Sequence, residues 1–145
     1  MSNSIERRPW RDGATRLLGA AGLPTADLTD AHMEHFFYCG NPEAPLALVG
    51  LEFCGENALL RSLAVAPEGR NSGVGSALVE RAESHARERG ARSIFLLTTT
   101  AEDFFRRRGY ESADRAAAPA AIRATREFAD ICPASSAFLT KSLAR

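Results

Sequence analysis

Residues 59–90 read LLRSLAVAPEGRNSGVGSALVERAESHARERG, and this stretch decides the fold. Its first residues are mostly apolar and predict a strand. After the glycines, apolar residues recur every three or four positions and predict an amphipathic helix that ends at Gly90. Between strand and helix, small residues let successive backbone N–H groups converge on one bulky anion, and the helix adds the positive end of its dipole. The stretch therefore predicts a turn that binds a diphosphate.

Two other phosphate-binding loops are excluded by the residues of this turn. No Lys-Ser or Lys-Thr pair follows the glycines, as a P-loop requires. Leu78 stands where a dinucleotide-binding GxGxxG turn has its third glycine. For the two glycines alone, a tight turn without a ligand stays an alternative.

Length and composition favour one domain that spans residues 1–145. The 18 basic and 18 acidic residues balance, which gives no support to binding of nucleic acid or of a membrane surface. The chain begins without the apolar segment of a signal peptide, and no apolar run approaches the ~20 residues of a membrane span. We therefore expect a cytoplasmic protein.

The periodicity along the chain predicts an α/β (α+β) fold. Strands at 35–39 and 46–53 should form an antiparallel hairpin, whereas the helix that links strands at 58–65 and 94–97 makes that pair parallel. We expect a mixed, mostly antiparallel central sheet flanked by helices. The other predicted elements are helices at 15–21, 29–33, 101–108 and 119–128 and strands at 110–113 and 136–141.

The turn and the strand before it follow the pattern L-x-V-x-P-x-x-R-G-x-G-x-G with one departure. The residues that match are Leu63, Val65, Pro67, Arg70, Gly73 and Gly75. Asn71 replaces the glycine after the arginine, and asparagine tolerates a left-handed backbone better than most residues. The pattern resembles the acetyl-CoA signature of the GCN5-related N-acetyltransferases, the GNAT family.

Residues 98–110, TTTAEDFFRRRGY, resemble a second segment of this family, N-x-x-A-x-x-F-Y-x-x-x-G-F. Thr98 stands where an asparagine commonly holds the pantetheine arm, and its hydroxyl can still hydrogen-bond an amide. Phe105 replaces the tyrosine that often protonates the leaving thiolate. A phenyl ring cannot donate a proton, so we expect Phe105 only to pack against the cofactor.

The resemblance implies direct transfer of acetyl from acetyl-CoA to an amine, in a fold whose two parallel strands splay apart around the pantetheine. A freed N–H near Val65 would bind the thioester oxygen, and Arg107 or Arg108 would reach the adenosine phosphate. The cofactor-binding residues implied in this way are Leu63, Ala64, Val65, Arg70, Asn71, Ser72, Gly73, Val74, Gly75, Ser76, Thr98, Phe105 and Arg108.

Glu52 is the predicted catalytic base that removes a proton from the substrate ammonium. It lies near the end of a strand between Leu51 and Phe53, where a half-buried carboxylate is suited to this role. Other interpretations stay open. Glu52 could point to solvent or bind the ammonium, Glu56 in the following turn is a weaker candidate, and water could carry the proton.

Four residues are predicted to bind the substrate. Arg61 is unusual inside an apolar strand and, with Ser62, is expected to bind an anionic group. Arg123 and Arg126 lie three residues apart, hence on one helical face, where they could clamp a carboxylate, phosphinate or arsinate. The segments LLRSLAVAP, LLTTTAEDFFRRRGY and IRATREFADICPASSAF resemble acetyltransferases associated with arsenic-resistance operons. That resemblance implies a small-molecule amine as partner, an amino acid such as arsinothricin or phosphinothricin.

Two functions of other classes stay open. Cys39, Cys54 and Cys132 could bind a trivalent arsenical in a sensor or carrier, although a buried free cysteine more often packs as a small apolar residue. Alternatively, the missing tyrosine is compatible with a domain that binds acetyl-CoA as a regulatory ligand without turnover. Three cysteines without CxxC spacing predict neither a disulfide framework nor a zinc site, and no metal is expected. A homodimer is a possible assembly.

Overall fold

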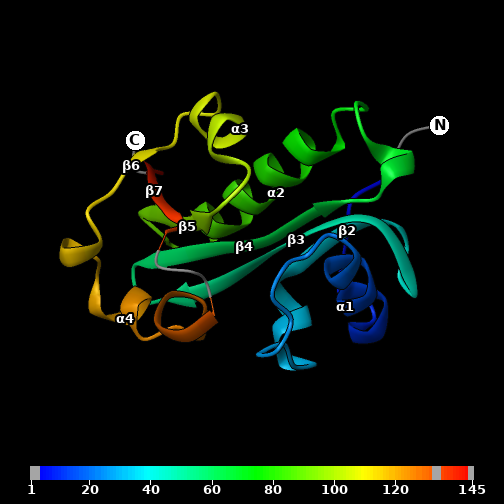
Figure 1. The fold of residues 1–145 in the computed structure, drawn as a ribbon, viewed down its shortest axis with the longest axis horizontal. Helices are drawn as coiled ribbons and strands as arrows, with labels where there is room; N and C mark the ends of the chain where they lie inside the picture. Colours follow the sequence, from blue (N-terminus) through cyan, green and yellow to red (C-terminus); the bar gives the residue numbers. More distant parts are fainter. Residues whose placement is uncertain (1–3, 132–134, 144–145) are drawn as a thin grey trace.

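The computed structural model describes residues 4–131 and 135–143, the side chains of residues 130 and 131 excepted, and contains one seven-stranded sheet (Figure 1). The strands lie in the order β1-β2-β3-β4-β5-β7-β6. Their bounds are β1 (Glu6–Arg7), β2 (Phe36–Asn41), β3 (Ala44–Cys54), β4 (Asn57–Val65), β5 (Ser93–Thr98), β6 (Glu111–Ser112) and β7 (Ala137–Ser142). The helices are α1 (Arg11–Ala20), α2 (Val74–Glu88), α3 (Glu102–Arg106) and α4 (Ala120–Arg123), with 3-10 turns η1 (Ala31–His35), η2 (Pro67–Gly69) and η3 (Arg115–Ala117) and the π turn η4 (Glu127–Ile131).

Only one pair of neighbouring strands in this sheet is parallel. β4 and β5 run in the same direction because α2 crosses between them, and the other five pairs are antiparallel. This confirms the prediction of a mixed, mostly antiparallel sheet. The parallel ladder is short: it ends at Leu59 and Phe95, although β4 continues to Val65 and β5 to Thr98. Beyond that point the two strands face each other without ladder pairing.

A bulge interrupts β4 just after the ladder with β5 ends. On the other edge of β4, Arg61 pairs with Gly50 and Ala64 pairs with Leu48. Two residues of β4, Ser62 and Leu63, therefore lie where β3 has a single residue. Such a bulge bends the strand and increases its twist, which contributes to the divergence of β4 from β5.

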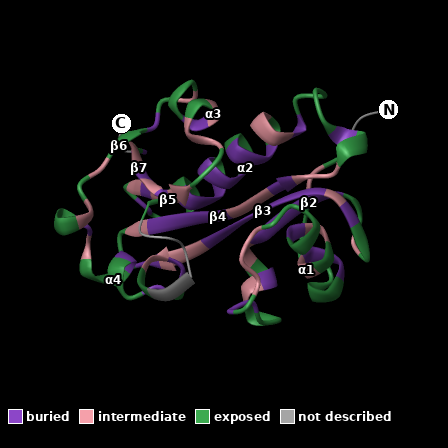
Figure 2. Cartoon of the chain, viewed as in Figure 1, coloured by how far each residue is buried: buried purple, intermediate pink, exposed green. Residues whose placement is uncertain are grey.

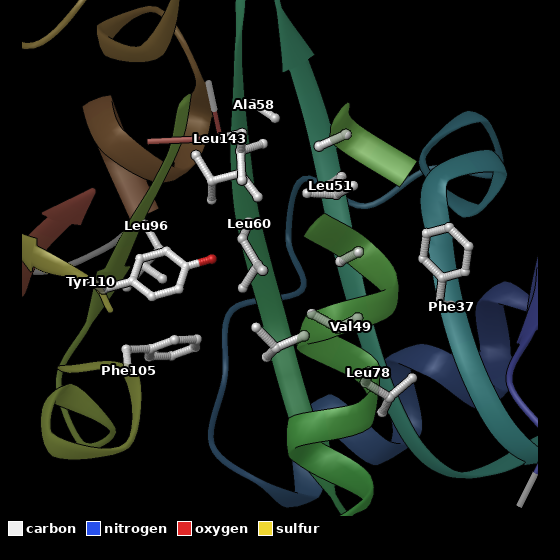
Figure 3. Close-up of a cluster of buried hydrophobic side chains, with 14 of the residues drawn as sticks. Phe37, Val49, Leu51, Ala58, Leu60, Leu78, Leu96, Phe105, Tyr110 and Leu143 are labelled. Atoms are coloured by element: carbon white, nitrogen blue, oxygen red, sulfur yellow. The ribbon is translucent and has the colours of Figure 1, made fainter. Parts of the chain in front are cut away.

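The helices cover both faces of the sheet, with α2 and α3 on one side and α1 and α4 on the other (Figure 1). Side chains alternate along β3, so that Val49 and Leu51 pack toward α2 whereas Leu48 packs toward α1. Buried residues are concentrated on the central strands and on the sheet-facing side of α2 (Figure 2). Figure 3 shows Leu60 of β4 and Leu78 of α2 in the larger core cluster. No helix in the described part of the chain is long and apolar enough to cross a membrane.

The element at 119–128 differs from its prediction. We expected one continuous helix, but α4 ends at Arg123 and the backbone turns before η4 begins at Glu127. Thr125 explains the break, because its hydroxyl donates to the Ile122 carbonyl at 2.7 Å and accepts from the Phe128 N–H at 3.3 Å. These bonds replace helical backbone bonds. The two-residue strand β1 was also missed, since so short a segment has no periodicity.

Buried His85 of α2 and half-buried His35 at the end of η1 lie next to each other. The ring centroids of His35 and His85 are 5.7 Å apart, and His35 Nδ1 and His85 Nε2 are buried without a hydrogen-bond partner among the described residues. Burial lowers the pKa of both rings below the ordinary 6.5, and the positive charges of Arg7 and Arg89 lower both further. Both rings are therefore neutral in the folded protein at neutral pH.

We predict that this histidine pair makes folding stability depend on pH. Because the folded-state pKa values are lowered, the unfolded chain binds protons first, so stability is full above about pH 6.5 and decreases as the pH falls below it. Replacing His85 by Phe keeps a ring in the core and removes one titrating group. Urea unfolding measured at about pH 7.5 and about pH 5 should show a smaller loss of stability for His85→Phe than for wild type. Equal losses would contradict the assignment.

Candidate active site

A cleft of about 450 Å³ opens between β4 and β5 where their ladder ends. Its walls come from both strands, from the segment after β5, from the loop after α1, and from η4. The lining residues are Gly22, Leu23, Pro24, Leu60, Arg61, Ser62, Leu63, Leu96, Leu97, Thr98, Thr99, Thr100, Ala101, Phe105, Glu127 and Ser136. Of these described residues only Arg61 and Glu127 are charged. The cleft is thus a mostly apolar slot with a few polar groups, as small-molecule sites usually are.

The side of the cleft next to β5 is fixed by the start of α3. Thr98 Oγ1 accepts a hydrogen bond from the Ala101 N–H at 3.0 Å, which ends the strand and turns the chain into the helix. The helix then places Phe105 in the cleft, where its ring packs edge-on against Tyr110 with centroids 5.4 Å apart (Figure 3). Thr98 and Phe105, both predicted as cofactor-binding, therefore line the same cavity.

The turn between β4 and α2 has the open backbone that the sequence predicts. Asn71 and Gly73 both have left-handed backbones, with φ of 63° and 82°, so asparagine does occupy a position that favours glycine. Arg70, Asn71, Ser72 and Gly73 are exposed, and Ser72 Oγ donates to the Gly69 carbonyl at 2.5 Å. The turn lies at the C-terminal end of β4 and does not line the cleft.

Arg108 is held beside the first turn of α2. Its Nε donates to Ser76 Oγ at 3.0 Å and its Nη1 donates to the Phe104 carbonyl at 2.7 Å. The guanidinium also stacks on the Phe104 ring, with Cζ 3.6 Å from the ring centroid. A fixed cation thus adjoins the positive end of the α2 dipole. Arg107, the alternative that the sequence left open, is exposed and shows no such contact in the described structure.

Arg61 lies at the centre of a buried ionic cluster, with a side chain that is 0% exposed. Asp27 binds it through both carboxylate oxygens, Oδ2 at 2.5 Å from Nη1 and Oδ1 at 2.9 Å from Nη2. Glu52 Oε2 lies 2.7 Å from Nη1, and Glu127 Oε2 lies 3.2 Å from Nη2. Burial opposes the charged form, but the hydrogen bond to Asp27, the charge of Glu127 and the hydrogen bond to Glu52 outweigh it and raise the pKa of Arg61.

The prediction that Arg61 binds an anionic group of the substrate stays a prediction, and this cluster argues against it. A guanidinium already paired with carboxylates has no uncompensated charge to offer a further anion. Asp27 is also ionised, since burial opposes its charge but the hydrogen bond and charge of Arg61 lower its pKa. One ligand atom each from Asp27, His32 and Glu52 lies within 4.8 Å of the others. The arginine beside two of these three groups makes this an ion-pair cluster and not a cation site.

Several other predicted site residues lie away from the cleft. Glu52 is 20% exposed, lies 3.9 Å from His32 Nε2, and reaches the cleft wall only through Arg61. Arg123 and Arg126 are exposed and separated by the break after α4, so they do not share the helical face on which the clamp prediction depended. The prediction of one face is wrong because Thr125 interrupts the helix.

The freed N–H predicted near Val65 stays a prediction, although the irregularity of β4 lies earlier in the strand. Val65 pairs with Ala47 and Ala64 pairs with Leu48 in the regular ladder with β3. The irregularity lies at Ser62 and Leu63, two to three residues earlier, because the bulge falls beside the end of the parallel ladder and not at the end of the strand.

The family follows from a comparison of sequences: a model of the acetyltransferase (GNAT) family matches residues 3–110. The chain belongs to the GNAT family. An amino-acid acetyltransferase from Pseudomonas fluorescens is 45% identical over 62 residues, which is 43% of this chain and 14% of the relative. A relative with the same description from Ectopseudomonas mendocina is 43% identical over 68 residues, 47% of this chain and 15% of its own. The chain thus spans only about a seventh of the length of these curated relatives.

Solved structures share the fold of this GNAT chain at low sequence identity. N-acetylglutamate synthase from Neisseria gonorrhoeae, crystallised with coenzyme A and N-acetyl-glutamate, superimposes with a TM-score of 0.81 and 20% identity over 100% of this chain and 36% of that one. An acetyltransferase of the GNAT family from Staphylococcus aureus gives a TM-score of 0.76 and 15% identity over 98% of this chain and 99% of its own. At these identities, both superpositions show a shared fold and nothing more.

Sequence reasoning missed two members of the site of this GNAT chain, Asp27 and Glu127. The signal that could have pointed to them is Arg61 itself, because an arginine in an apolar strand requires buried carboxylates. The sequence could not select which carboxylates, since Asp27 lies 34 residues before Arg61 along the chain. Only the folded structure brings them together.

The cysteines do not form one site in the described part of this GNAT chain. Cys39 packs in the core beside α2, whereas Cys54 packs with Leu59 and Ile122 on the opposite face of the sheet. Burial raises the pKa of both thiols, that of Cys54 to about 11, which disfavours the thiolate needed to bind an arsenical. Cys132 lies outside the described residues.

Proposed function

We propose that this GNAT chain transfers the acetyl group of acetyl-CoA to the amine of a small molecule. The observation that carries the proposal is the cleft between two parallel strands whose ladder ends at Leu59 and Phe95. Relatives described as amino-acid acetyltransferases, and a fold neighbour crystallised with coenzyme A, support the same activity.

The pantetheine arm is proposed to lie between the facing edges of β4 and β5. Backbone groups of β4 from Leu60 to Val65 have no partner on β5 in the described ladder, so an extended ligand with amides can satisfy them. Thr98 Oγ1 already accepts from Ala101, which leaves its hydroxyl hydrogen for a pantetheine carbonyl. The diphosphate would bind at residues 70–76, with Arg108 beside it.

The reaction proposed is direct attack of the amine nitrogen on the thioester carbon. The C–N bond forms, the C–S bond breaks, and coenzyme A leaves as a thiolate that takes up one proton. The amine must lose a proton from its ammonium before attack and a second one afterwards.

Phe105 cannot supply the proton that the thiolate takes up. Nor can Tyr110, whose hydroxyl donates to Glu83 Oε2 at 2.9 Å and whose pKa is raised by burial and by that carboxylate. Water is therefore the proposed acid.

The ionic cluster supplies two candidate bases for the ammonium proton. Glu52 is the base proposed from the sequence, and it contacts Arg61 at the cleft wall. Glu127 is the carboxylate that lines the cleft itself. Both hold one oxygen against Arg61, so that the arginine orients each carboxylate.

A second, more specific proposal concerns which amine is the substrate. The resemblance to arsenic-resistance acetyltransferases favours an amino acid with an arsinate or phosphinate, such as arsinothricin or phosphinothricin. Such a substrate needs cations for its second anion, but Arg61 is compensated, and Arg123 and Arg126 do not line the cleft. Among the described residues, the cleft thus suits an ammonium better than a second anion, and we propose these amino acids as candidates within a wider panel.

A panel of amines with acetyl-CoA tests the proposed activity. Thiol release should be measured with simple alkylamines, the common amino acids, phosphinothricin and arsinothricin. We expect at least one amine to release thiol in an amine-dependent manner, with mass spectrometry showing one added acetyl group. Binding of coenzyme A without turnover on any amine would favour the regulatory alternative. Absence of coenzyme A binding by calorimetry would contradict the proposal.

A charge placed in the turn before α2 should prevent cofactor binding. In Gly73→Asp a carboxylate would face the diphosphate, and two like charges about 4 Å apart repel by up to about 4 kcal/mol near a protein surface. We expect the Kd for coenzyme A to rise by at least about 100-fold. Gly73→Asn is the matched control, because asparagine has the same shape without charge and accepts φ of 82°. Similar affinities of the two variants would show that the diphosphate binds elsewhere.

Replacing the catalytic base should give a characteristic pH profile. Glu52→Gln should lower kcat most at low pH, and the loss should shrink toward about pH 10, where an alkylamine is already neutral. Glu127→Gln and Glu56→Gln should be measured in parallel, with exposed Glu88→Gln as control. If only Glu127→Gln shows this profile, Glu127 is the base and the role of Glu52 is disproved.

A further inference from the structure

The side chains of Arg61 and Ser62, which are consecutive on β4, form a hydrogen bond that a regular strand does not allow. Consecutive residues of a strand point to opposite faces. Arg61 Nε nevertheless donates a hydrogen bond to Ser62 Oγ at 2.9 Å. The bulge makes this possible, since Ser62 has a left-handed backbone with φ of 62°. That conformation is unfavourable for a residue with a Cβ atom, so it persists only where surrounding contacts impose it.

Arg61 is a fixed donor in this bond because three other segments hold its guanidinium. Asp27 comes from the loop after α1, Glu52 from β3 and Glu127 from η4. The bidentate pair with Asp27 fixes the plane of the guanidinium as well as its position. Any movement of Ser62 out of the left-handed conformation would break its bond to an arginine that cannot follow.

The bulge lies at the point that decides the shape of the cleft. The last residue of β4 paired with β5 is Leu59, and Arg61, Ser62 and Leu63 line the cleft just beyond it. Glu127 forms another wall, and Asp27 follows the lining segment 22–24 within a few residues. Arg61 therefore connects the cleft walls that carry Asp27 and Glu127 to the bulged part of β4.

We infer that Arg61 is a positioning residue: it holds Ser62 in the left-handed conformation and thereby fixes the bulged backbone of β4 at the mouth of the cleft. Its contribution to catalysis passes through the backbone of Ser62 and Leu63, and not through contact of the guanidinium with the substrate. The kinetic part of this inference rests on the proposed acetyl transfer. The conformational part concerns the folded chain alone.

Two substitutions of Ser62 test the inference. Ser62→Ala removes the hydroxyl that Arg61 holds and keeps the Cβ atom that makes φ of 62° unfavourable. Ser62→Gly removes the same hydroxyl but adopts this conformation freely. We expect Ser62→Ala to lower kcat about tenfold and the melting temperature by about 3 °C, and Ser62→Gly to lower kcat less than about threefold with a smaller shift in melting temperature. Equal losses of kcat would mean that the hydroxyl itself contacts the substrate, which would overturn the inference.

A substitution of Arg61 separates positioning from anion binding. Arg61→Lys keeps the positive charge among the carboxylates but lacks the Nε–H donor to Ser62. We expect kcat to fall about tenfold with the KM for the amine changed less than about threefold, and the double variant Arg61→Lys with Ser62→Gly to recover most of that loss. A rise in KM that glycine at position 62 does not restore would show direct binding of substrate by Arg61 and overturn the inference.

The two sets of measurements distinguish this inference from the proposed function. If wild type acetylates no amine, the proposed function fails, and the melting temperatures still decide the conformational part. Ser62→Ala must then be less stable than Ser62→Gly, and equal stability overturns it. If wild type is active and the two Ser62 variants are equally impaired, the function stands and the positioning role is wrong.

Discussion

Backbone pairing between β4 and β5 ends at Leu59 and Phe95, and the two strand edges beyond this point face each other across a cleft. Backbone N–H and C=O groups need partners wherever water is excluded, so unpaired strand edges inside a fold are retained only where something else can occupy them. An extended ligand with amide groups is such an occupant. The short ladder thus supports the proposed position of the pantetheine arm, and the turn before α2 supports the proposed position of the diphosphate.

The divergence of β4 from β5 depends on an ion-pair cluster inside an apolar core. Arg61 is buried at the bulge, and a lone buried arginine would destabilise the fold. Three carboxylates from distant segments compensate its charge, and the resulting cluster ties the α1 loop, β3, β4 and η4 together. Because breaking one partner of such a cluster leaves an uncompensated charge, its geometry is strongly specified. A cluster of this kind is better suited to fix the shape of a cleft than to bind a mobile anion.

Local patterns predicted those parts of the structure that local physics controls. The amphipathic periodicity of α2, the left-handed positions at Asn71 and Gly73, and the parallel crossover between β4 and β5 follow from neighbouring residues and from chain connectivity. The predicted helix at 119–128 failed for an equally local reason: the Thr125 hydroxyl competes for backbone groups, which hydrophobic periodicity does not register. The bulge at Ser62 and Leu63 was not predicted, because its position depends on register with β3 and not on the composition of β4 alone.

The sequence by itself determined the family, the order of the strands around the crossover helix, and the open turn before α2, because each is encoded within a few tens of residues. It also singled out Arg61 as exceptional. Only the tertiary structure decided which groups Arg61 contacts, because its partners lie 34 residues before it at Asp27 and 66 residues after it at Glu127. An isolated arginine in a strand is equally compatible with an anion-binding group and with a buried ion pair. The difference depends on which carboxylates the fold brings within hydrogen-bond distance.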